Sequence, residues 1–215
     1  MPPNDPFSTR RRPQQARAER TLQVIFEATA RVLREEGEAA FTTNRIAARA
    51  GVSIGTLYQY FDDKEAILQA ILRRTRKRLV GQLDALLSNV DPDSDTPSAS
   101  DPKQVLRAYV RLYLAAYGTG SDDERLLLRL AWSLDRHDAL VLALRETSEH
   151  IAVHLQRMEH PLVRAPTPAM TFVLTRALAG VVRSAALEES PLLGTQAFED
   201  ELVKLCWGVL AAAED

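Results

Sequence analysis

The sequence contains a single cysteine, Cys206, among its 215 residues, so the chain cannot form an internal disulfide. Cys206 lies in an apolar stretch beside Leu205 and Trp207, and we interpret it as a small core residue in a reducing compartment. No apolar run approaches the roughly 18–20 residues that span a bilayer. No hydrophobic stretch follows the N-terminal arginines, as it would in a secretory signal. We therefore expect a cytoplasmic protein without a membrane partner.

Several other patterns are missing from the sequence. It has no internal repeat and no strand-like alternation of apolar and polar residues, which favours an all-α fold. It also has no P-loop, no dinucleotide-binding fingerprint and no nucleophile elbow. We therefore expect neither enzymatic activity nor a cofactor.

The small net charge of −2 conceals an uneven distribution. Residues 1–80 carry 15 Lys and Arg against 9 Asp and Glu, whereas residues 81–215 carry 12 against 20. A basic N-terminal part joined to an acidic remainder suggests that only the first part meets a polyanion. Uneven charge on a solvated surface is the alternative interpretation.

The apolar periodicity predicts helices along most of the chain. Residues 1–18, rich in proline and arginine, are expected to be disordered. A helix then continues to Gly37, and two short helices follow, at 44–50 after Thr42 and Thr43 and from Ser53 to about Tyr60. A long helix is predicted at 62–88, and further helices at 103–117, 122–135, 137–158, 167–189 and 195–213. The predicted domains are 1–18, 19–65 and 66–215, with helix 62–88 connecting the last two.

Two short helices joined by Gly51, Val52 and Ser53 are typical of a helix-turn-helix, whose second helix enters the major groove of DNA. Apolar residues suited to an inner face are Ile46, Ala47, Ala50, Val52, Leu57 and Phe61. The residues left for the outer face of the second helix are short or polar. An exposed helical glycine at position 55 costs about 1 kcal/mol relative to alanine, which is understandable where another backbone must come close.

The residues from Thr42 to Leu68 follow the pattern Thr-Thr-x-x-Ile-Ala-x-x-Ala-Gly-Val-Ser-x-Gly-Thr-Leu-Tyr-x-Tyr-Phe-x-x-Lys-Glu-x-Ile-Leu. With this pattern, the region from about Leu22 to Leu72 resembles the DNA-binding domain of the TetR family of regulators. The pattern is long and specific but covers only about a quarter of the chain. The remainder fits the family in layout more than in sequence, as a helical ligand-binding and dimerisation domain.

The resemblance implies a sequence-specific transcriptional regulator, a homodimeric repressor that a small-molecule effector releases from a palindromic operator on double-stranded DNA. It implies phosphate contacts by Thr43, Tyr60 and Lys64 and base-facing positions at Thr56, Tyr58 and Gln59. The DNA-binding residues implied are Thr43, Arg45, Ser53, Ile54, Gly55, Thr56, Tyr58, Gln59, Tyr60 and Lys64. Ile54 departs from the family, since many members have lysine there. The run Arg10-Arg11-Arg12 could enter the minor groove or remain a solvated tail.

The C-terminal part contains a continuous apolar stripe in helix 167–189 and a second one in the last helix. The resemblance implies that these two helices form the dimer interface, and a purely internal core is the alternative. The predicted interface residues are Leu174, Ala177, Leu178, Val181, Val182, Leu202, Leu205 and Val209. The predicted pocket residues are Tyr109, Tyr113, Tyr117, Trp132, Phe172 and Arg176. The tyrosines could instead be core residues, and Arg176 could pair with an anionic effector or with an acid such as Glu146.

His150 and His154 lie one helical turn apart, a spacing that suits a metal ion. No cysteine or third histidine lies nearby in the sequence, so we expect no metal site. Two functions from other classes remain open: a helical-bundle enzyme, which needs titratable groups converging in the C-terminal core, and a protein-binding module whose helix-turn-helix does not bind DNA.

Overall fold

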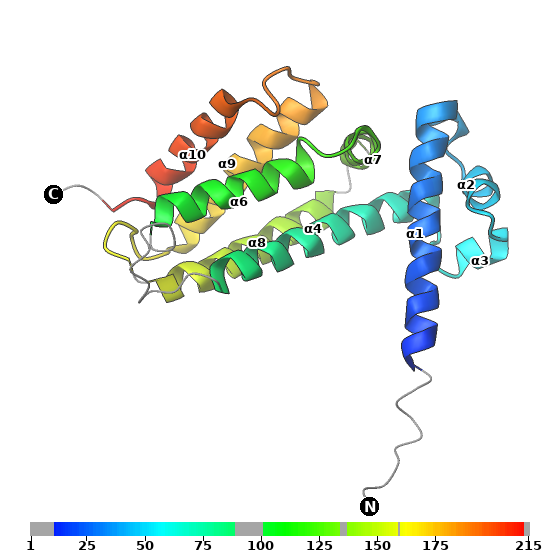
Figure 1. Cartoon of the computed structure of the whole chain (residues 1–215), viewed down its shortest axis with the longest axis horizontal. Coiled ribbons are helices and arrows are strands. Elements are labelled where there is room, and N and C mark those ends of the chain that lie inside the picture. Colours follow the sequence, from blue (N-terminus) through cyan, green and yellow to red (C-terminus); the bar gives the residue numbers. More distant parts are fainter. Residues whose placement is uncertain (1–10, 89–100, 134–136, 159, 213–215) are drawn as a thin grey trace, which may run out of the picture. The chain divides into compact units, whose positions relative to one another are not determined.

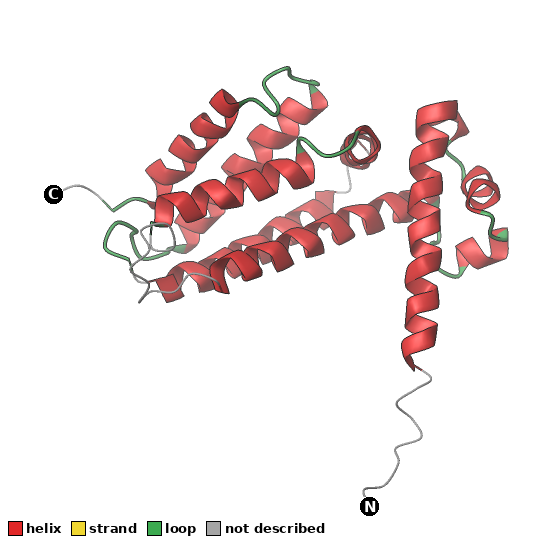
Figure 2. Cartoon of the chain, viewed as in Figure 1, coloured by secondary structure: helices red, strands yellow, loops and turns green. Residues whose placement is uncertain are grey.

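The computed structural model describes residues 11–88, 101–133, 137–158 and 160–212. Within these residues the chain is helical apart from its connecting segments and one isolated β-bridge between Val163 and Ala211 (Figures 1 and 2). The all-α prediction is therefore confirmed. The helices are α1 (Arg11–Glu36), α2 (Thr43–Ala50), α3 (Ile54–Tyr58), α4 (Lys64–Ser88), α6 (Pro102–Tyr117), α7 (Asp122–Ser133), α8 (His137–Met158), α9 (Pro168–Leu187) and α10 (Gln196–Leu210), with a 3-10 turn, η1, at Glu38–Ala40.

The contacts divide the chain into two compact units. The first comprises residues up to Leu72 together with Leu126–Ala131, and the second comprises Arg73–Arg125 and Trp132–Asp215. The boundary therefore lies within α4, seven residues beyond the predicted one, because α4 continues without a break through that point.

In the first unit, α1 begins at Arg11, so the prediction of disorder through residue 18 is wrong for residues 11–18. Pro13 is compatible with this because proline is tolerated in the first turn of a helix. The following residues, from Ala16 to Arg20, have high helix propensity. Arg10 lies outside the described residues, so the predicted arginine arm is described only from Arg11 onward.

Local capping fixes the ends of the short helices, as the sequence predicted. The Thr42 side chain accepts a hydrogen bond from the Arg45 backbone N–H at 3.2 Å, and Ser53 accepts one from Thr56 at 3.0 Å. Gly51 ends α2 with a φ of 68°, a left-handed conformation that favours glycine. Asp63 accepts a bond from the Ala66 N–H at the start of α4.

Apolar side chains of all four N-terminal helices fill the core of the first unit. Phe26 packs on Phe61 with ring centroids 6.1 Å apart, and the hydroxyl of the fully buried Thr29 donates to the Ile25 carbonyl. The buried residues include Ile25, Ala28, Val32, Leu33, Phe41, Ile46, Ala47, Leu57, Phe61, Ile67 and Leu68. This packing orients the chain from Thr42 to Phe61.

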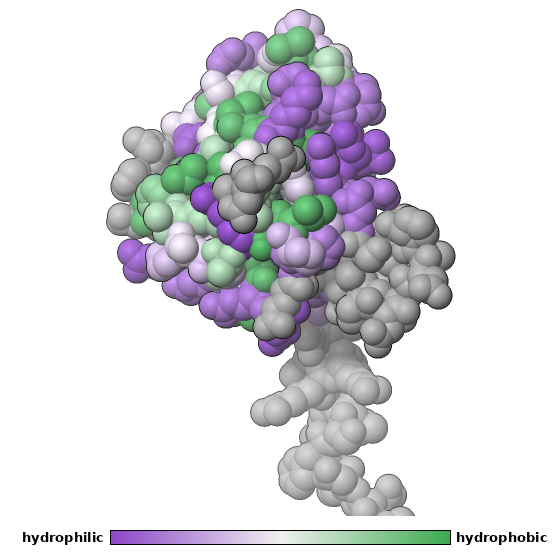
Figure 3. Space-filling view, turned by 90° about the vertical axis from the view of Figure 1, so that its left-hand side faces the viewer, coloured by the Kyte–Doolittle hydropathy of each residue, from purple (hydrophilic) through white to green (hydrophobic). Residues whose placement is uncertain are grey.

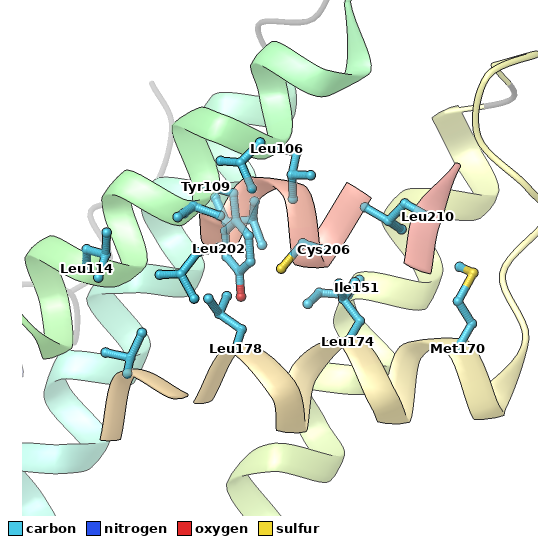
Figure 4. Packing of buried hydrophobic residues seen from close by; sticks show 14 residues of the cluster. Leu106, Tyr109, Leu114, Ile151, Met170, Leu174, Leu178, Leu202, Cys206 and Leu210 are labelled. Atoms are coloured by element: carbon cyan, nitrogen blue, oxygen red, sulfur yellow. The ribbon is translucent and has the colours of Figure 1, made fainter. Parts of the chain in front are cut away.

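The core of the second unit lies among α4, α6, α8, α9 and α10. Figure 4 shows side chains from these helices pointing toward one another, with the Cys206 sulfur among them. Burial raises the pKa of the Cys206 thiol to about 11. The prediction that Cys206 is a core residue is therefore confirmed, and its thiol is protonated at neutral pH.

Helix α9 is long and apolar enough to cross a membrane by length and composition alone, so the prediction that no such stretch exists is wrong. A core helix of a globular domain meets the same criteria. Buried residues of α9 include Met170, Leu174, Leu178 and Val182, which belong to the hydrophobic core of the second unit. Packing inside the unit therefore accounts for the apolar character of that side of α9.

An ion-pair cluster connects α6 to α10. The Glu199 carboxylate, only 11% exposed, accepts hydrogen bonds from Arg111 Nε and Arg107 Nη1 at 2.9 Å, and Asp200 accepts another from Arg107 at 2.5 Å. Burial raises the pKa of Glu199, but the hydrogen bonds from the two arginines outweigh it, so the pKa lies below its ordinary value. The hydrogen bond from Arg107 likewise lowers the pKa of Asp200. Both carboxylates therefore stabilise the folded state in their charged forms.

The Glu199→Gln variant is expected to lower the free energy of unfolding at pH 7 by roughly 1–3 kcal/mol, because Arg111 loses its charged partner and Arg107 loses one of its two. A carboxylate with a depressed pKa contributes stability above its ordinary pKa, and that contribution disappears as the pH falls through the lowered value. The difference from the wild type should therefore shrink below about pH 4. Urea unfolding followed by circular dichroism at several pH values measures it. Glu201→Gln is the matched control, since Glu201 is exposed and pairs with Lys204 at the surface, and a loss as large as that of Glu199→Gln would contradict the argument.

Candidate nucleic-acid interface and ligand pocket

Helix α3 shows one side to the core and the other to solvent. Leu57 is fully buried, whereas Tyr58 is 51% exposed and Ile54 37% exposed. Ser53, Gly55 and Gln59 are also exposed, and Thr56 is half-buried. The Ser53 and Thr56 hydroxyls lie 2.8 Å apart at the first turn of the helix. The first unit therefore presents a short surface of hydroxyl, amide and phenol groups on α3.

A second group of polar atoms lies where α2 begins. The Thr43 hydroxyl is 3.2 Å from the Tyr58 hydroxyl. Thr43 is the first residue of α2, so the backbone N–H groups around it have no partner within the helix. Such N–H groups, next to two hydroxyls and the positive end of the helix dipole, suit an anion. Tyr58, for which the resemblance implied a base-facing role, thus lies beside this helix start.

Two of the predicted DNA-binding residues, Lys64 and Arg45, carry positive charge. The Lys64 Nζ lies 5.1 Å from the centre of the Phe41 ring, at the start of α4. The guanidinium of Arg45 donates from Nε to Glu36 at 2.5 Å, and this hydrogen bond raises the pKa of Arg45. Arginine has five N–H donors, so Arg45 keeps others for a further partner. Tyr60, 36% exposed, packs its ring against Phe61.

No internal contact explains the glycine at position 55. A Cβ added there would meet only the Ser53 hydroxyl oxygen, at 3.8 Å, which is ordinary van der Waals contact. Gly55 is exposed and lacks the positive φ that would require glycine. Alanine would therefore fit in the free protein and would favour the helix by about 1 kcal/mol.

The second unit contains an apolar pocket bounded by α4, α6, α8, α9 and α10. Leu83 of α4 contributes to its wall, and His154 of α8 is its basic residue. The complete lining is Leu83, Pro102, Val105, Leu106, Tyr109, Ile151, His154, Leu155, Val163, Leu174, Trp207 and Leu210. This composition suits an apolar ligand with few polar groups.

Of the six predicted pocket residues, only Tyr109 lines this pocket. Tyr109, Tyr113 and Tyr117 form an aromatic series along α6 that continues to Trp132, with neighbouring centroids 4.8–6.2 Å apart. Burial raises the pKa of Tyr117 to about 12. The tyrosines are therefore largely packed within the unit, as the alternative interpretation held.

Phe172 and Arg176 form a pair on α9. The Arg176 guanidinium carbon lies 4.3 Å from the centre of the Phe172 ring, which is 57% exposed. Arg176 Nη1 also donates to the Leu144 carbonyl at 3.1 Å and to the Ser148 hydroxyl. Glu146, the acid considered for Arg176, instead pairs with Arg76 of α4.

The predicted dimer residues divide between two sides of α9 and α10. Leu174, Leu178, Val182 and Leu202 are at most 4% exposed, so their assignment to a dimer surface is corrected: they belong to the core of the second unit. Val181 and Leu205 are 38% and 43% exposed, Ala177 is half-buried, and Val209 packs partly against the core. The predicted interface did not include two further exposed apolar residues on this side of α9, Val173 and Leu187. The exposed Phe172 lies on the opposite side from Val181, because nine residues of an α-helix make two and a half turns.

Sequence reasoning missed a cluster of side chains of the types that can bind a metal ion. His150 and His154 of α8 meet Asp84 of α4, with each histidine Nε2 3.0 Å from the carboxylate oxygen Oδ1. The third side chain lies 66 positions before His150, so no local spacing could have revealed it.

Comparison with known proteins agrees with the geometry of the first unit. Residues 25–71 match the family model described as "Bacterial regulatory proteins, tetR family". The HTH-type transcriptional regulator BetI of Yersinia pestis is 32% identical over 111 residues, 48% of this chain and 56% of that protein. The nucleoid occlusion factor SlmA of Actinobacillus pleuropneumoniae is 26% identical over 132 residues, 57% of this chain and 63% of that protein. The match thus spans less than two thirds of each of these relatives.

The whole fold is also similar to a solved structure. A TetR-family transcriptional regulator from Streptomyces coelicolor superposes with a TM-score of 0.59 over 88% of this chain and 96% of that one, at 22% identity. Residues 25–71 thus match the TetR family model, and the fold over most of the chain is similar to that of a TetR-family regulator.

Proposed function

We propose that this protein is a sequence-specific transcriptional repressor that binds a palindromic operator as a homodimer and leaves it when a small apolar effector binds. In this proposal it acts in the cytoplasm and is not an enzyme. The observation that carries the proposal is the exposed polar surface of α3, held outward by the buried Leu57 and Phe61. Such a surface has no packing role in the free protein and fits the major groove.

The roles proposed for the individual residues follow from their positions. Thr43 and Tyr58, with hydroxyls 3.2 Å apart beside the start of α2, bind one backbone phosphate. Lys64, Arg45 and Tyr60 bind further phosphates. Gln59 and Thr56 face base edges, where Gln59 can make two hydrogen bonds to adenine. Ser53, Ile54 and Gly55 form the part of α3 that comes closest to the bases.

The proposal is tested first by selecting binding sites from random duplex DNA with the full-length protein. The expected result is a palindrome whose half-sites are about one helical turn, 34–36 Å, apart, because two copies of a short reading helix reach successive major grooves. Failure to select any sequence at low ionic strength would reject the proposal and favour the protein-binding alternative.

Gln59→Ala and Lys64→Ala are expected to change DNA binding in different ways. Gln59→Ala should weaken the selected operator by roughly 1–3 kcal/mol and relax the preference at one base pair, while leaving binding to unrelated DNA unchanged. Lys64→Ala should weaken binding to all sequences. Because one phosphate contact is lost, the slope of log K against log salt concentration should become less steep by about one. Fluorescence anisotropy at several salt concentrations distinguishes the two. An equal loss on every sequence for Gln59→Ala would contradict its role in base readout.

The pocket supports the effector part of the proposal. Its wall is mainly apolar, so burial of apolar ligand surface would drive binding. Leu83 of the wall and Lys64 of the DNA-binding unit belong to the same continuous helix, α4. A ligand that fits the pocket better in one position of α4 than in another would therefore bias DNA binding. Compounds that raise the melting temperature identify candidate effectors, and operator release tests them.

The homodimer is supported by the outer face of α9 and α10. Val173, Val181 and Leu187 are exposed on one side of α9, and Leu205 is exposed on α10. Gly180 lies on the same side of α9 as Val173, and Gly208 is one turn from Leu205 on α10; a Cβ at either position would meet nothing within 4 Å. Exposed apolar residues beside small ones suit the close approach of helices from a second copy. Figure 3 shows hydrophobic surface in the centre and on the left of one view of the molecule.

A further inference from the structure

We propose that Asp84, His150 and His154 form a binding site for one divalent transition-metal ion, such as Zn²⁺. The proposal concerns the second unit alone and does not depend on DNA binding. It replaces the expectation, based on the sequence, that the two histidines have no metal partner.

The three donor atoms are close enough to hold one ion. His150 Nε2 and His154 Nε2 each lie 3.0 Å from Asp84 Oδ1, and the two Nε2 atoms are 3.0 Å from each other. Two donors at a right angle, each about 2.1 Å from one ion, would be separated by about 3.0 Å, and at a tetrahedral angle by about 3.3–3.4 Å. The cluster thus has the dimensions of three ligands on one side of an ion.

The positions of the donors in the fold support the same conclusion. His150 and His154 are one turn apart on α8, so their rings project from one side of that helix. Asp84 belongs to α4. A second contact between the two helices, the ion pair of Arg76 of α4 with Glu146 of α8, lies about two turns along α4 from Asp84. Figure 1 shows α4 and α8 running side by side. Two contacts between these helices therefore fix the distance across which the carboxylate and imidazoles meet.

An ion would satisfy this cluster better than protons can. A neutral imidazole carries one N–H, and His154 Nε2 faces both a carboxylate and another imidazole nitrogen. One N–H cannot be directed fully at both acceptors. A cation between the three atoms accepts a lone pair from each of them. It also removes the repulsion between the two ring nitrogens, which otherwise face each other directly.

The donor types define the class of ion. Imidazole nitrogen suits zinc, cobalt, nickel, copper and iron, whereas magnesium and calcium prefer sites made of oxygen alone. Two histidines and one carboxylate leave further coordination positions for water or another ligand. The side chains are 29%, 17% and 48% exposed for His150, His154 and Asp84, so an ion from solvent can reach them.

The test is titration of the chelator-treated full-length protein with Zn²⁺ by calorimetry. The expected result is one ion per chain, a raised melting temperature with Zn²⁺, and no equivalent binding of Mg²⁺. Asp84→Asn and His150→Asn should each reduce Zn²⁺ affinity at least tenfold. His160→Asn is the matched control, because it removes an imidazole outside the cluster, and it should leave the affinity unchanged. Equal Zn²⁺ binding by the wild type and Asp84→Asn, or no binding by either, would overturn the proposal.

Co²⁺ gives a second readout on the unmodified chain, which guards against a variant that does not fold. Binding at the cluster should produce weak visible bands from nitrogen and oxygen ligands. An intense near-ultraviolet thiolate band would place the ion at Cys206 and would also overturn the assignment.

Discussion

Val181→Glu is expected to convert the proposed dimer into a monomer and to weaken operator binding at least 100-fold. Val181 is 38% exposed on the outer face of α9, next to Gly180. In a symmetric dimer each substitution occurs twice, and each buried, unpaired carboxylate costs a few kcal/mol. Simultaneous contact of two recognition helices with two half-sites raises the apparent affinity by about 10²–10⁴. The monomer loses this gain. Light scattering after size exclusion and anisotropy on the selected operator measure the two effects.

Val153→Glu provides the matched control. Val153 is 43% exposed on α8, so the two variants introduce the same charge at a similarly exposed valine. It should remain dimeric and bind the operator normally. Circular dichroism should show both variants folded, because neither valine belongs to the core. A dimeric Val181→Glu protein would place the interface elsewhere on the surface.

Gly55→Ala is expected to act in opposite directions on stability and on DNA binding. In the free protein the added methyl group meets only the Ser53 hydroxyl, so the helix gains about 1 kcal/mol of stability. On DNA the same methyl group would lie between α3 and the base edges, and we expect at least a tenfold loss of affinity. Gly55→Leu should extend the loss beyond 100-fold, since its side chain is larger while its helix propensity remains high.

The control for this prediction is Gly81→Ala. Gly81 is also exposed within a helix, α4, and has nothing within 4 Å of an added Cβ. It should gain similar stability without changing operator affinity in the absence of effector. Thermal unfolding and anisotropy on the same preparations give both quantities. If Gly55→Ala binds DNA as well as the wild type, the backbone of α3 does not approach the bases closely.

Local signals in the sequence predicted the helices well. Helix α8 has the predicted bounds, and α6 begins one residue earlier than predicted. Capping residues explain this success, because Thr42, Ser53 and Asp101 each bond to a backbone N–H at a helix start. The polar surface of α3 could also be inferred from the sequence, because all its residues lie within one short segment.

The proposed dimer face was harder to predict because α9 is apolar on more than one side. Leu174, Leu178 and Val182 point into the core, while Val173 and Val181 beside them are exposed. Periodicity indicates an apolar stripe but not which neighbour covers it. The exposed fraction of each residue in the folded unit distinguishes the side of α9 that faces the core from the side that faces solvent.

The pocket and the histidine cluster depend on contacts between distant segments. The pocket combines residues from Leu83 to Leu210. The aromatic residues of α6 were predicted to line the pocket, yet Tyr113 and Tyr117 mainly pack against each other. Asp84 meets His154 across 70 positions. Only the tertiary packing of the second unit brings such residues together.

Because α4 is continuous from Lys64 to Ser88, a small tilt at one end produces a larger displacement at the other. With a rise of about 1.5 Å per residue, the helix from Leu83 to Lys64 spans about 29 Å. A tilt of about 5° around its pocket end would carry Lys64 through about 2.5 Å, nearly the length of a hydrogen bond. A side-chain adjustment too small to alter the core would thus be amplified into a displacement large enough to break the phosphate contact proposed for Lys64.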